Sequence, residues 1–127
     1  MNKVLIIDDD LALLEILEAS LQYAQFNVKA VSECPDLFAL ISSYQPDVVL
    51  LDYVLSGVNG GELCYQIKSN PSTSNIPVII ITAYPRMINS LDAYLCNAVL
   101  PKPFDLSDLL FTINACISNP SVSLKKQ

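Results

Sequence analysis

The stretch Asp47–Asp52, with the sequence DVVLLD, decides the fold class of this chain. Four apolar residues stand between two aspartates, and such a continuous run is typical of a strand that is buried on both faces of a parallel sheet. Four other short apolar runs, each of strand length, predict four more strands. They lie at Lys3–Ile7, Val28–Val31, Pro77–Thr82 and Ala98–Leu100.

Segments with helical periodicity separate these strands. Leu11–Ala24 carries leucines at 11, 14, 17 and 21, which share one face of a helix, and we expect an aspartate within Asp8–Asp10 to cap it. Pro35 is expected to be the first residue of the next helix, which stops before Pro46. Further helices are predicted at about Glu62–Ser69, weakly near Arg86–Leu95, and after Asp105.

The alternation of strand and helix in five βα units predicts an α/β fold. Its core is a five-stranded parallel sheet, doubly wound, with helices on both faces and right-handed crossovers. The 127 residues make one domain, and no repeat or linker divides them. We expect the domain to cover residues 1–118, and residues 119–127 to form a frayed polar tail with no output domain.

Composition excludes several classes of protein. Apolar residues make up 52% of the chain, which is enough to bury a core, so disorder is excluded. Thirteen acidic residues against seven basic ones give a net charge of −6, and there is no basic patch for nucleic acid. No apolar run has the length of a membrane span or of a signal-peptide core. The four cysteines form no C-x-x-C pair and are expected to be reduced, so we expect a cytoplasmic protein.

Polar residues stand where the predicted strands end. Asp8–Asp10 follow the first strand, and Asp52 ends the third. Thr82 ends the fourth strand, and Lys102 follows the fifth. Because the carboxyl ends of parallel strands meet at one edge of a sheet, these side chains are expected to converge there. Carboxylates gathered in this way need a cation, and an all-oxygen cluster without histidine suits Mg²⁺. The lysine and the threonine beside it favour a further anionic ligand, most simply a phosphoryl group.

Four segments of the chain carry a resemblance to a known family: KVLIIDDD, PDVVLLDYVLSGVNGGEL, IPVIIITAY and LPKPFDLSDLL. In this order and at nearly this spacing, they resemble the response-regulator receiver domain of two-component signalling over about residues 3–118. The resemblance implies a flavodoxin-like sheet with the strand order 2-1-3-4-5. It also implies a phosphoacceptor signalling switch, and not an enzyme beyond its own phosphoryl transfer and dephosphorylation.

The resemblance implies a phosphoacceptor and a metal site. Asp52 is implied as the phosphoacceptor. Asp9 is implied as a direct Mg²⁺ ligand, and Asp8 acts mainly through metal-bound water. Asp52 and the backbone carbonyl of Val54 would complete the protein's share of the coordination.

Three further residues are implied to hold the phosphoryl group: the hydroxyl of Thr82, the backbone N–H of Ala83 and the ammonium of Lys102. The metal and the lysine would stabilise the equatorial oxygens while Asp52 attacks in line. The donor is expected to be a phosphohistidine of a sensor histidine kinase or a histidine phosphotransfer protein, or a small phosphodonor, because this chain has no histidine. A downstream protein is also an expected partner, and receivers of this family often form homodimers.

Three residues near the proposed site are expected to have structural roles. Asp10 is expected to be a helix cap or a solvated acid. Gly60 is expected in a turn that needs a positive φ. Pro103 is expected to follow a cis peptide bond, as the family usually has one after this lysine.

Several positions depart from the family's pattern. Val54 and Tyr84 stand two residues after the acceptor and after the threonine, where side chains influence the attack of water on the phosphoaspartate. We therefore expect slow self-dephosphorylation. Val99 replaces an aromatic switch residue, and the segment before Lys102 is about two residues short. Output is accordingly expected through a different surface, or through a larger rearrangement of Pro85–Ala98.

Alternatives from other functional classes remain open. A degenerate receiver could serve as a phosphorylation-independent interaction or dimerisation module, which the departures at Val99 and before Lys102 favour. A phosphatase with an aspartate nucleophile would need a second carboxylate two residues later, where Val54 stands. A flavin-binding protein would need a phosphate-binding loop after the first strand, and the sequence has none there.

Overall fold

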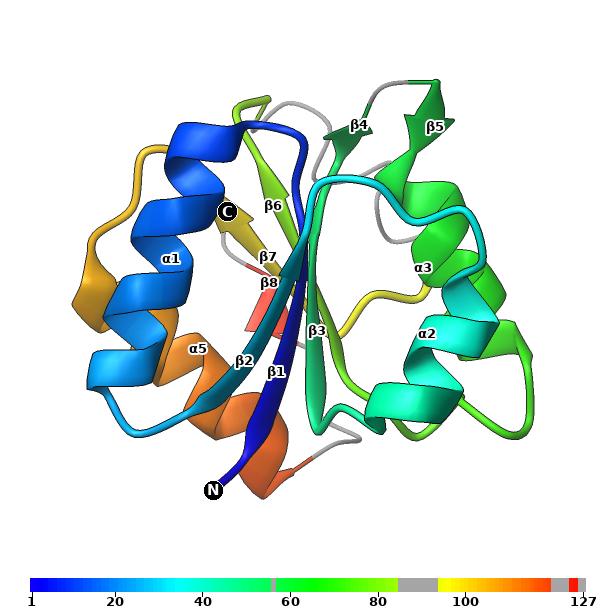
Figure 1. The fold of residues 1–127 in the computed structure, drawn as a ribbon. Coiled ribbons are helices and arrows are strands. Elements are labelled where there is room, and N and C mark those ends of the chain that lie inside the picture. Colours follow the sequence, from blue (N-terminus) through cyan, green and yellow to red (C-terminus); the bar gives the residue numbers. More distant parts are fainter. Residues whose placement is uncertain (56, 85–93, 120–123, 126–127) are drawn as a thin grey trace.

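Figure 1 shows the fold in a computed structural model, which describes residues 1–55, 57–84, 94–119 and 124–125. One sheet contains six parallel strands in the order β2-β1-β3-β6-β7-β8. The first five of these reproduce the predicted order 2-1-3-4-5, so the predicted flavodoxin-like fold is confirmed. The strands are β1 (Lys3–Ile7), β2 (Asn27–Val31), β3 (Val48–Asp52), β6 (Val78–Thr82), β7 (Ala98–Pro101) and β8 (Leu124–Lys125).

Helices cover both faces of the sheet. In the described part of the chain they are α1 (Leu11–Tyr23), α2 (Leu37–Tyr44), α3 (Gly60–Ser69) and α5 (Leu106–Ser118). α1 and α5 lie on one face, and α2 and α3 lie on the other (Figure 1). An apolar cluster fills each layer, and successive residues of β3 belong alternately to the two clusters. Every residue of β3 is buried, as the DVVLLD run predicts.

The helix α2 begins later than expected. Its first residue is Leu37 and not Pro35, so the prediction of a proline at the start of this helix is wrong. The carboxylate of Asp36 accepts a hydrogen bond from the N–H of Ala39 at 3.0 Å and caps the helix. An aspartate that satisfies a free backbone N–H fixes the start of a helix more strongly than the φ of a proline two residues earlier.

The helix α3 begins two residues earlier than expected, at Gly60 and not at Glu62. Asn59 caps it by accepting the N–H of Gly61 at 2.7 Å. Gly60 does not have a positive φ, so that prediction is wrong as well. The glycine is needed for space, because a Cβ at position 60 would lie 2.0 Å from the carbonyl oxygen of Asp52.

Two short strand pairings were not predicted. β4 (Val54–Leu55) and β5 (Val58–Asn59) form an antiparallel hairpin above the carboxyl end of β3 (Figure 1). β8 pairs with the outer edge of β7, so the prediction of a frayed tail is wrong for residues 124–125. The weak helix expected near Arg86–Leu95 falls largely on residues 85–93, which lie outside the described residues.

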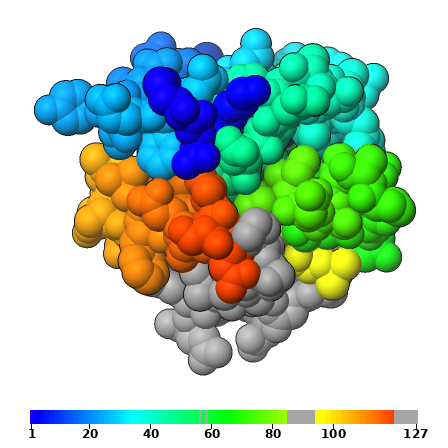
Figure 2. Space-filling model, turned by 90° about the horizontal axis from the view of Figure 1, so that it is seen from below, coloured from blue at the N-terminus to red at the C-terminus, as the bar shows by residue number. Residues whose placement is uncertain are grey.

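The amino ends and the carboxyl ends of the parallel strands lie at opposite ends of the molecule. Seen from the amino ends, the blue N-terminal residues lie beside the orange-red end of α5 (Figure 2). None of the described helices has the length and apolar character that crossing a membrane requires. The polar residues of interest all lie at the other end, where the strands finish.

The close packing of Gly60 against Asp52 is testable. We expect Gly60→Ala to lower the free energy of unfolding by about 1–3 kcal/mol, because the methyl group would overlap a backbone oxygen that cannot move away alone. Chemical denaturation monitored by circular dichroism measures this loss. Gly57→Asn is the control: Gly57 has a φ of 72° and open space around it, and asparagine tolerates that φ. An equal or greater stability of Gly60→Ala would contradict the proposed contact.

Candidate functional site

The register of the sheet brings the predicted site residues to one edge. Ile7 lies opposite Leu51, and Thr82 lies opposite Pro101. The strands β1, β3, β6 and β7, which are neighbours in this order, therefore finish at the same edge of the sheet. The residues at or just beyond these ends are Asp8, Asp52 and Lys102, and Thr82 ends β6 between the last two.

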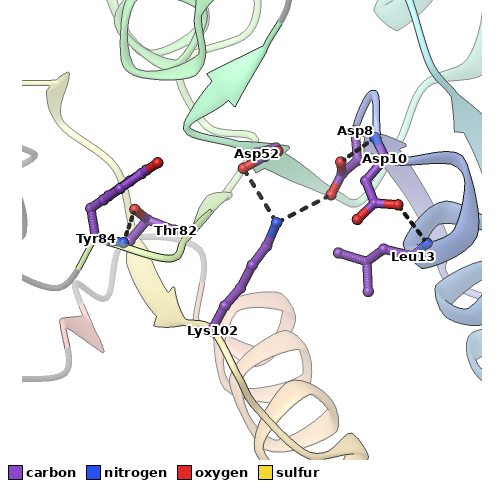
Figure 3. A network of polar contacts seen from close by, with 7 residues as sticks. All are labelled: Asp8, Asp10, Leu13, Asp52, Thr82, Tyr84 and Lys102. Atoms are coloured by element: carbon purple, nitrogen blue, oxygen red, sulfur yellow. Dashed lines mark hydrogen bonds and ion pairs between the residues drawn. The ribbon is translucent and has the colours of Figure 1, made fainter.

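The charged side chains at this edge form one cluster (Figure 3). The Nζ of Lys102 lies 3.6 Å from Oδ1 of Asp52 and 3.9 Å from Oδ2 of Asp8. Asp8, Asp9 and Asp52 each offer a carboxylate oxygen, and these three oxygens lie within 4.8 Å of one another. The predicted convergence of three carboxylates and one lysine is therefore present in the structure.

Asp8 is the most deeply buried member of the cluster, with 1% of its surface exposed. Its Oδ1 accepts a hydrogen bond from the N–H of Asp10 at 2.9 Å. Its Oδ2 is buried and makes no hydrogen bond with the residues that the structure describes. A buried carboxylate oxygen without a donor is costly, and a bound cation would remove that cost.

The two acids after Asp8 have different roles. Asp9 is exposed and contributes an oxygen to the cluster. Asp10 caps α1, because its Oδ1 accepts a hydrogen bond from the N–H of Leu13 at 3.2 Å (Figure 3). The expected role of Asp10 as a helix cap is confirmed.

The carboxyl group of Asp52 is perturbed by its surroundings. Its pKa is raised from 3.8 to about 6, chiefly by desolvation and also by the negative charge of Asp8. Lys102 and a backbone hydrogen bond from Val54 act in the opposite direction and lower the pKa. A perturbed acid beside a like charge is typical of functional sites, since such an arrangement adds nothing to stability.

Thr82 is buried at the end of β6, with 1% of its surface exposed. Its Oγ1 accepts a hydrogen bond from the N–H of Tyr84 at 3.0 Å, which leaves the hydroxyl proton to be donated elsewhere (Figure 3). Ala83 lies between these two residues and is exposed. The side chain of Val54 is also exposed, and the implied roles of its carbonyl and of the Ala83 N–H stay predictions.

Lys102 is held by its own backbone. Its N–H donates to the carbonyl oxygen of Thr82 at 2.7 Å, which ties the lysine to the end of β6. The peptide bond between Lys102 and Pro103 is cis, as predicted. The side chain is partly buried, and its ammonium lies between the carboxylates of Asp8 and Asp52.

The residues present fit a magnesium ion. Carboxylate oxygens from Asp8, Asp9 and Asp52 converge, and hard oxygen ligands of this kind suit Mg²⁺. The buried Oδ2 of Asp8, which has no hydrogen-bond donor among the described residues, is a second sign that a cation belongs beside it. The chain contains no histidine that would favour a softer metal.

Two grooves adjoin the site, and no sequence pattern predicted them because each is built by elements distant along the chain. One groove has a volume of about 330 Å³ and lies beside Lys102, where apolar residues of α1 face apolar residues at the start of α5. The other groove has a volume of about 510 Å³, and Asp9 is one of its lining residues. Its remaining lining residues are Ile7, Leu11, Ser32, Glu33, Cys34, Pro35, Leu55 and Leu63.

The fold and the site together define a class of protein. A doubly wound parallel sheet with an acidic cluster at the carboxyl ends of its strands is a flavodoxin-like α/β protein with its binding site at that edge. The response regulator receiver domain family matches residues 4–114. The chain therefore belongs to the response regulator receiver domain family of two-component systems.

Individual relatives agree with this assignment. The chain is 30% identical over 119 residues to the DNA-binding dual master transcriptional regulator RpaA of Synechocystis sp., covering 92% of this chain and 49% of RpaA. It is 31% identical over 122 residues to the response regulator MprA of Mycobacterium sp., covering 94% of this chain and 52% of MprA. This chain thus spans about half the length of these curated relatives.

Solved structures share the fold. The signal receiver domain of a DNA-binding response regulator from Colwellia psychrerythraea superposes with a TM-score of 0.83 at 28% identity, over 94% of this chain and all of that one. The response regulator TrrA of Thermotoga maritima, solved in complex with Mg²⁺ and BeF, gives a TM-score of 0.81 at 22% identity. That match covers 91% of this chain and 98% of TrrA, and it shows the fold alone.

The raised pKa of Asp52 predicts a pH-dependent stability difference. In the folded state the carboxyl binds its proton more tightly than in the unfolded state, so it contributes most stability below pH 4 and loses that contribution as the pH rises through 6. We expect Asp52→Asn to raise the free energy of unfolding at pH 7.5 by about 1–2 kcal/mol in EDTA. This is less than the free energy that corresponds to the whole pKa shift of Asp52, because solvent reaches the pocket and screens the charges.

The comparison is made by urea unfolding of both proteins from pH 7.5 to pH 4. The advantage of Asp52→Asn is expected to shrink as the pH falls and to vanish near pH 4. Addition of Mg²⁺ is expected to stabilise the wild type and to narrow the difference at pH 7.5. A constant difference across this pH range would show that the Asp52 charge is not the cause.

Proposed function

We propose that this receiver domain accepts a phosphoryl group on Asp52 from a phosphohistidine of a sensor histidine kinase or a histidine phosphotransfer protein. The observation that carries the proposal is the position of Lys102, 3.6 Å from the Asp52 carboxylate, beside two more carboxylates at the edge of the sheet. A structural ion pair does not need a cluster of three acids beside its lysine, whereas phosphoryl transfer needs a nucleophile, a cation and a metal site together.

The reaction is a transfer between two nucleophiles. An oxygen of the Asp52 carboxylate attacks phosphorus, and the new O–P bond forms while the N–P bond to the donor's imidazole breaks. The imidazole nitrogen leaves with the electron pair of that bond and takes up a proton. With a pKa of about 6, the Asp52 carboxyl is largely ionised at pH 7.5 and is available as the nucleophile.

Residues of this chain orient and neutralise the transferred group. Lys102 offsets charge on the phosphoryl oxygens, since its ammonium already lies beside the attacking carboxylate. The Thr82 hydroxyl donates to one of these phosphoryl oxygens. The N–H of Tyr84 donates to Oγ1 of Thr82 and so holds this hydroxyl in place. The backbone N–H of Ala83 is proposed as a further donor.

The metal site completes this arrangement. We assign Asp9, Asp52 and the backbone carbonyl of Val54 as direct ligands of Mg²⁺, and Asp8 as a partner through metal-bound water. Bound Mg²⁺ supplies positive charge that offsets the charge developing on the phosphoryl oxygens. Without it, the acidic cluster would repel an incoming phosphate group.

The wider assignment follows from the same site. The domain is proposed to cover residues 1–118 and to act in the cytoplasm as a switch that a downstream protein recognises, with self-association as a further mode of action. Val99 is buried in the apolar cluster on the α2 and α3 face, with 2% of its surface exposed. Because position 99 is a valine, we propose that the output of this domain does not rely on an aromatic side chain there and uses a different surface.

Phosphorylation of Asp52 is directly testable. Incubation of the purified protein with acetyl phosphate and Mg²⁺ is expected to give a second band on Phos-tag electrophoresis, because the proposed nucleophile Asp52 lies beside Lys102 and the acidic cluster. Asp52→Asn and omission of Mg²⁺ are each expected to abolish that band. Asp10→Asn is the matched control: Asp10 is a neighbouring acid that caps a helix, and its loss is expected to leave the band in place. Absence of the band in the wild type would favour the phosphorylation-independent interaction module.

A slow loss of the phosphoryl group is a second expectation. The Val54 side chain is 53% exposed and has no group that could orient a water molecule towards the phosphoaspartate. We expect Val54→Asn to shorten the half-life of the phosphorylated form by about three- to tenfold, because an amide can position that water. Val54→Ala is the control, as it removes bulk without adding a polar group, and a similar acceleration by both variants would point to steric shielding instead. The decay of the Phos-tag band after removal of the donor measures these rates.

A further inference from the structure

The aromatic ring of Tyr94 occupies the space that a side chain at position 61 would need. A Cβ on Gly61 would lie 2.4 Å from both Cδ2 and Cε2 of this ring. Gly61 is the second residue of α3 and does not have a positive φ, so the backbone conformation does not require a glycine there. The Tyr94 ring, together with Oδ1 of Asn59 at 2.9 Å, therefore fills the space that a Cβ at position 61 would need.

Tyr94 also contacts the residue that follows the phosphoacceptor. Its ring centroid lies 6.3 Å from that of Tyr53, and the ring planes are tilted by 47°, which is a favourable aromatic geometry. A hydrogen bond between the Tyr53 and Tyr94 side chains is the largest cause of a raised pKa at Tyr94, and a hydrogen bond with Asn59 partly opposes it. Tyr94 thus reaches both ends of the connection between β3 and α3.

Tyr53 is in turn tied closely to Asp52. Its side chain is buried, with 8% exposed, and its N–H donates to the carbonyl oxygen of Ile81 at 2.9 Å. Its own carbonyl accepts the N–H of Gly60 at 2.9 Å. Tyr53 follows Asp52 directly in the chain and is hydrogen-bonded to β6 and α3, so it links the Asp52 backbone to the ring that Tyr94 contacts.

The residue after Tyr94 is strained. Leu95 has a φ of 65°, in the left-handed region that disfavours leucine, and 51% of its surface is exposed. The next two residues are fixed, because Cys96 is buried and Asn97 exchanges two hydrogen bonds with Val78, each of 2.9 Å. Leu95 thus lies between two anchors, the packed ring of Tyr94 and the start of β7, and its left-handed turn joins them.

We infer that Tyr94 is a positioning residue that couples the connection between β3 and α3 to residues 95–97, through its contacts with Tyr53 and Gly61. The inference rests on the proposed phosphorylation of Asp52, and it adds the route by which a change there leaves the site. A shift of Tyr53 on phosphorylation changes the packing of Tyr94. The strained turn at Leu95 responds because the residues that follow it are fixed by the hydrogen bonds between Asn97 and Val78. Val99 is buried in the same apolar cluster as Tyr53 and Cys96, and the proposed route runs through the ring of Tyr94, which packs against that cluster.

The test follows backbone amide signals by ¹H–¹⁵N NMR during addition of Mg²⁺ and beryllofluoride. In the wild type we expect shifts at Tyr53, Gly60 and Gly61, and also at residues 95–97. In Tyr94→Leu the first group is expected to shift as before, while the shifts at residues 95–97 fall at least threefold. Tyr94→Phe is expected to retain most of them, because it keeps the ring against Gly61. Gly61→Ala is expected to behave like Tyr94→Leu, since its methyl group displaces the ring.

The outcomes separate this inference from the proposed function. If the wild type shows no shifts around Asp52, the proposed phosphorylation site fails. If those shifts appear and residues 95–97 respond equally in the wild type and in Tyr94→Leu, the coupling through Tyr94 is overturned. Phosphorylation by acetyl phosphate is expected to stay within twofold of the wild-type rate in Tyr94→Leu, because Tyr94 is not part of the charged cluster.

A double-mutant cycle tests the strained turn independently of phosphorylation. Leu95→Gly is expected to raise the melting temperature by a few degrees, because glycine adopts a positive φ without strain. In the Tyr94→Leu background this gain is expected to shrink, since the contact that imposes the turn is gone. Equal gains in both backgrounds would show that Tyr94 does not impose the conformation of Leu95, and would overturn that part of the coupling.

Discussion

Three carboxylates held together at one edge of the sheet are the constraint on which the rest of this structure depends. Asp8, Asp9 and Asp52 place oxygens within 4.8 Å of one another, and one ammonium from Lys102 offsets only part of their mutual repulsion. Such a cluster costs folding free energy, as the raised pKa of Asp52 indicates. Charged groups that destabilise a fold in this way are typical of functional sites, and here the same charges are proposed to bind a cation and a phosphoryl group.

The surrounding structure holds these charges in place through backbone contacts. The lysine is fixed by the hydrogen bond from its N–H to Thr82, and Asp8 is fixed by the N–H of Asp10. Gly60 lets α3 approach the carbonyl oxygen of Asp52, where any Cβ would collide. The site is thus pre-organised by the ends of the strands, by a helix cap and by the close packing that Gly60 allows. Phosphoryl transfer by positioning requires such a rigid arrangement.

Much of the fold and of the charged site was predictable because both depend on local patterns. Buried parallel strands read as continuous apolar runs, and residues that end such strands must meet at one edge. Where predictions were wrong, a contact with a distant residue or a competing cap decided the outcome. Asp36 competed with Pro35 for the start of α2, and Gly60 is explained by Asp52, eight residues earlier, and not by its own φ.

The sequence by itself determined which residues form the buried strands and which polar residues end them, including the acidic cluster and Lys102. It also determined the membership in the receiver family. Each of these follows from residue types at fixed spacing. Only the tertiary structure decided how Tyr94 packs on Gly61 and Tyr53, and how residues 124–125 extend the sheet beside β7. No periodicity reports these contacts, since they join segments far apart along the chain. A glycine in a sequence does not say which distant side chain fills the space it leaves.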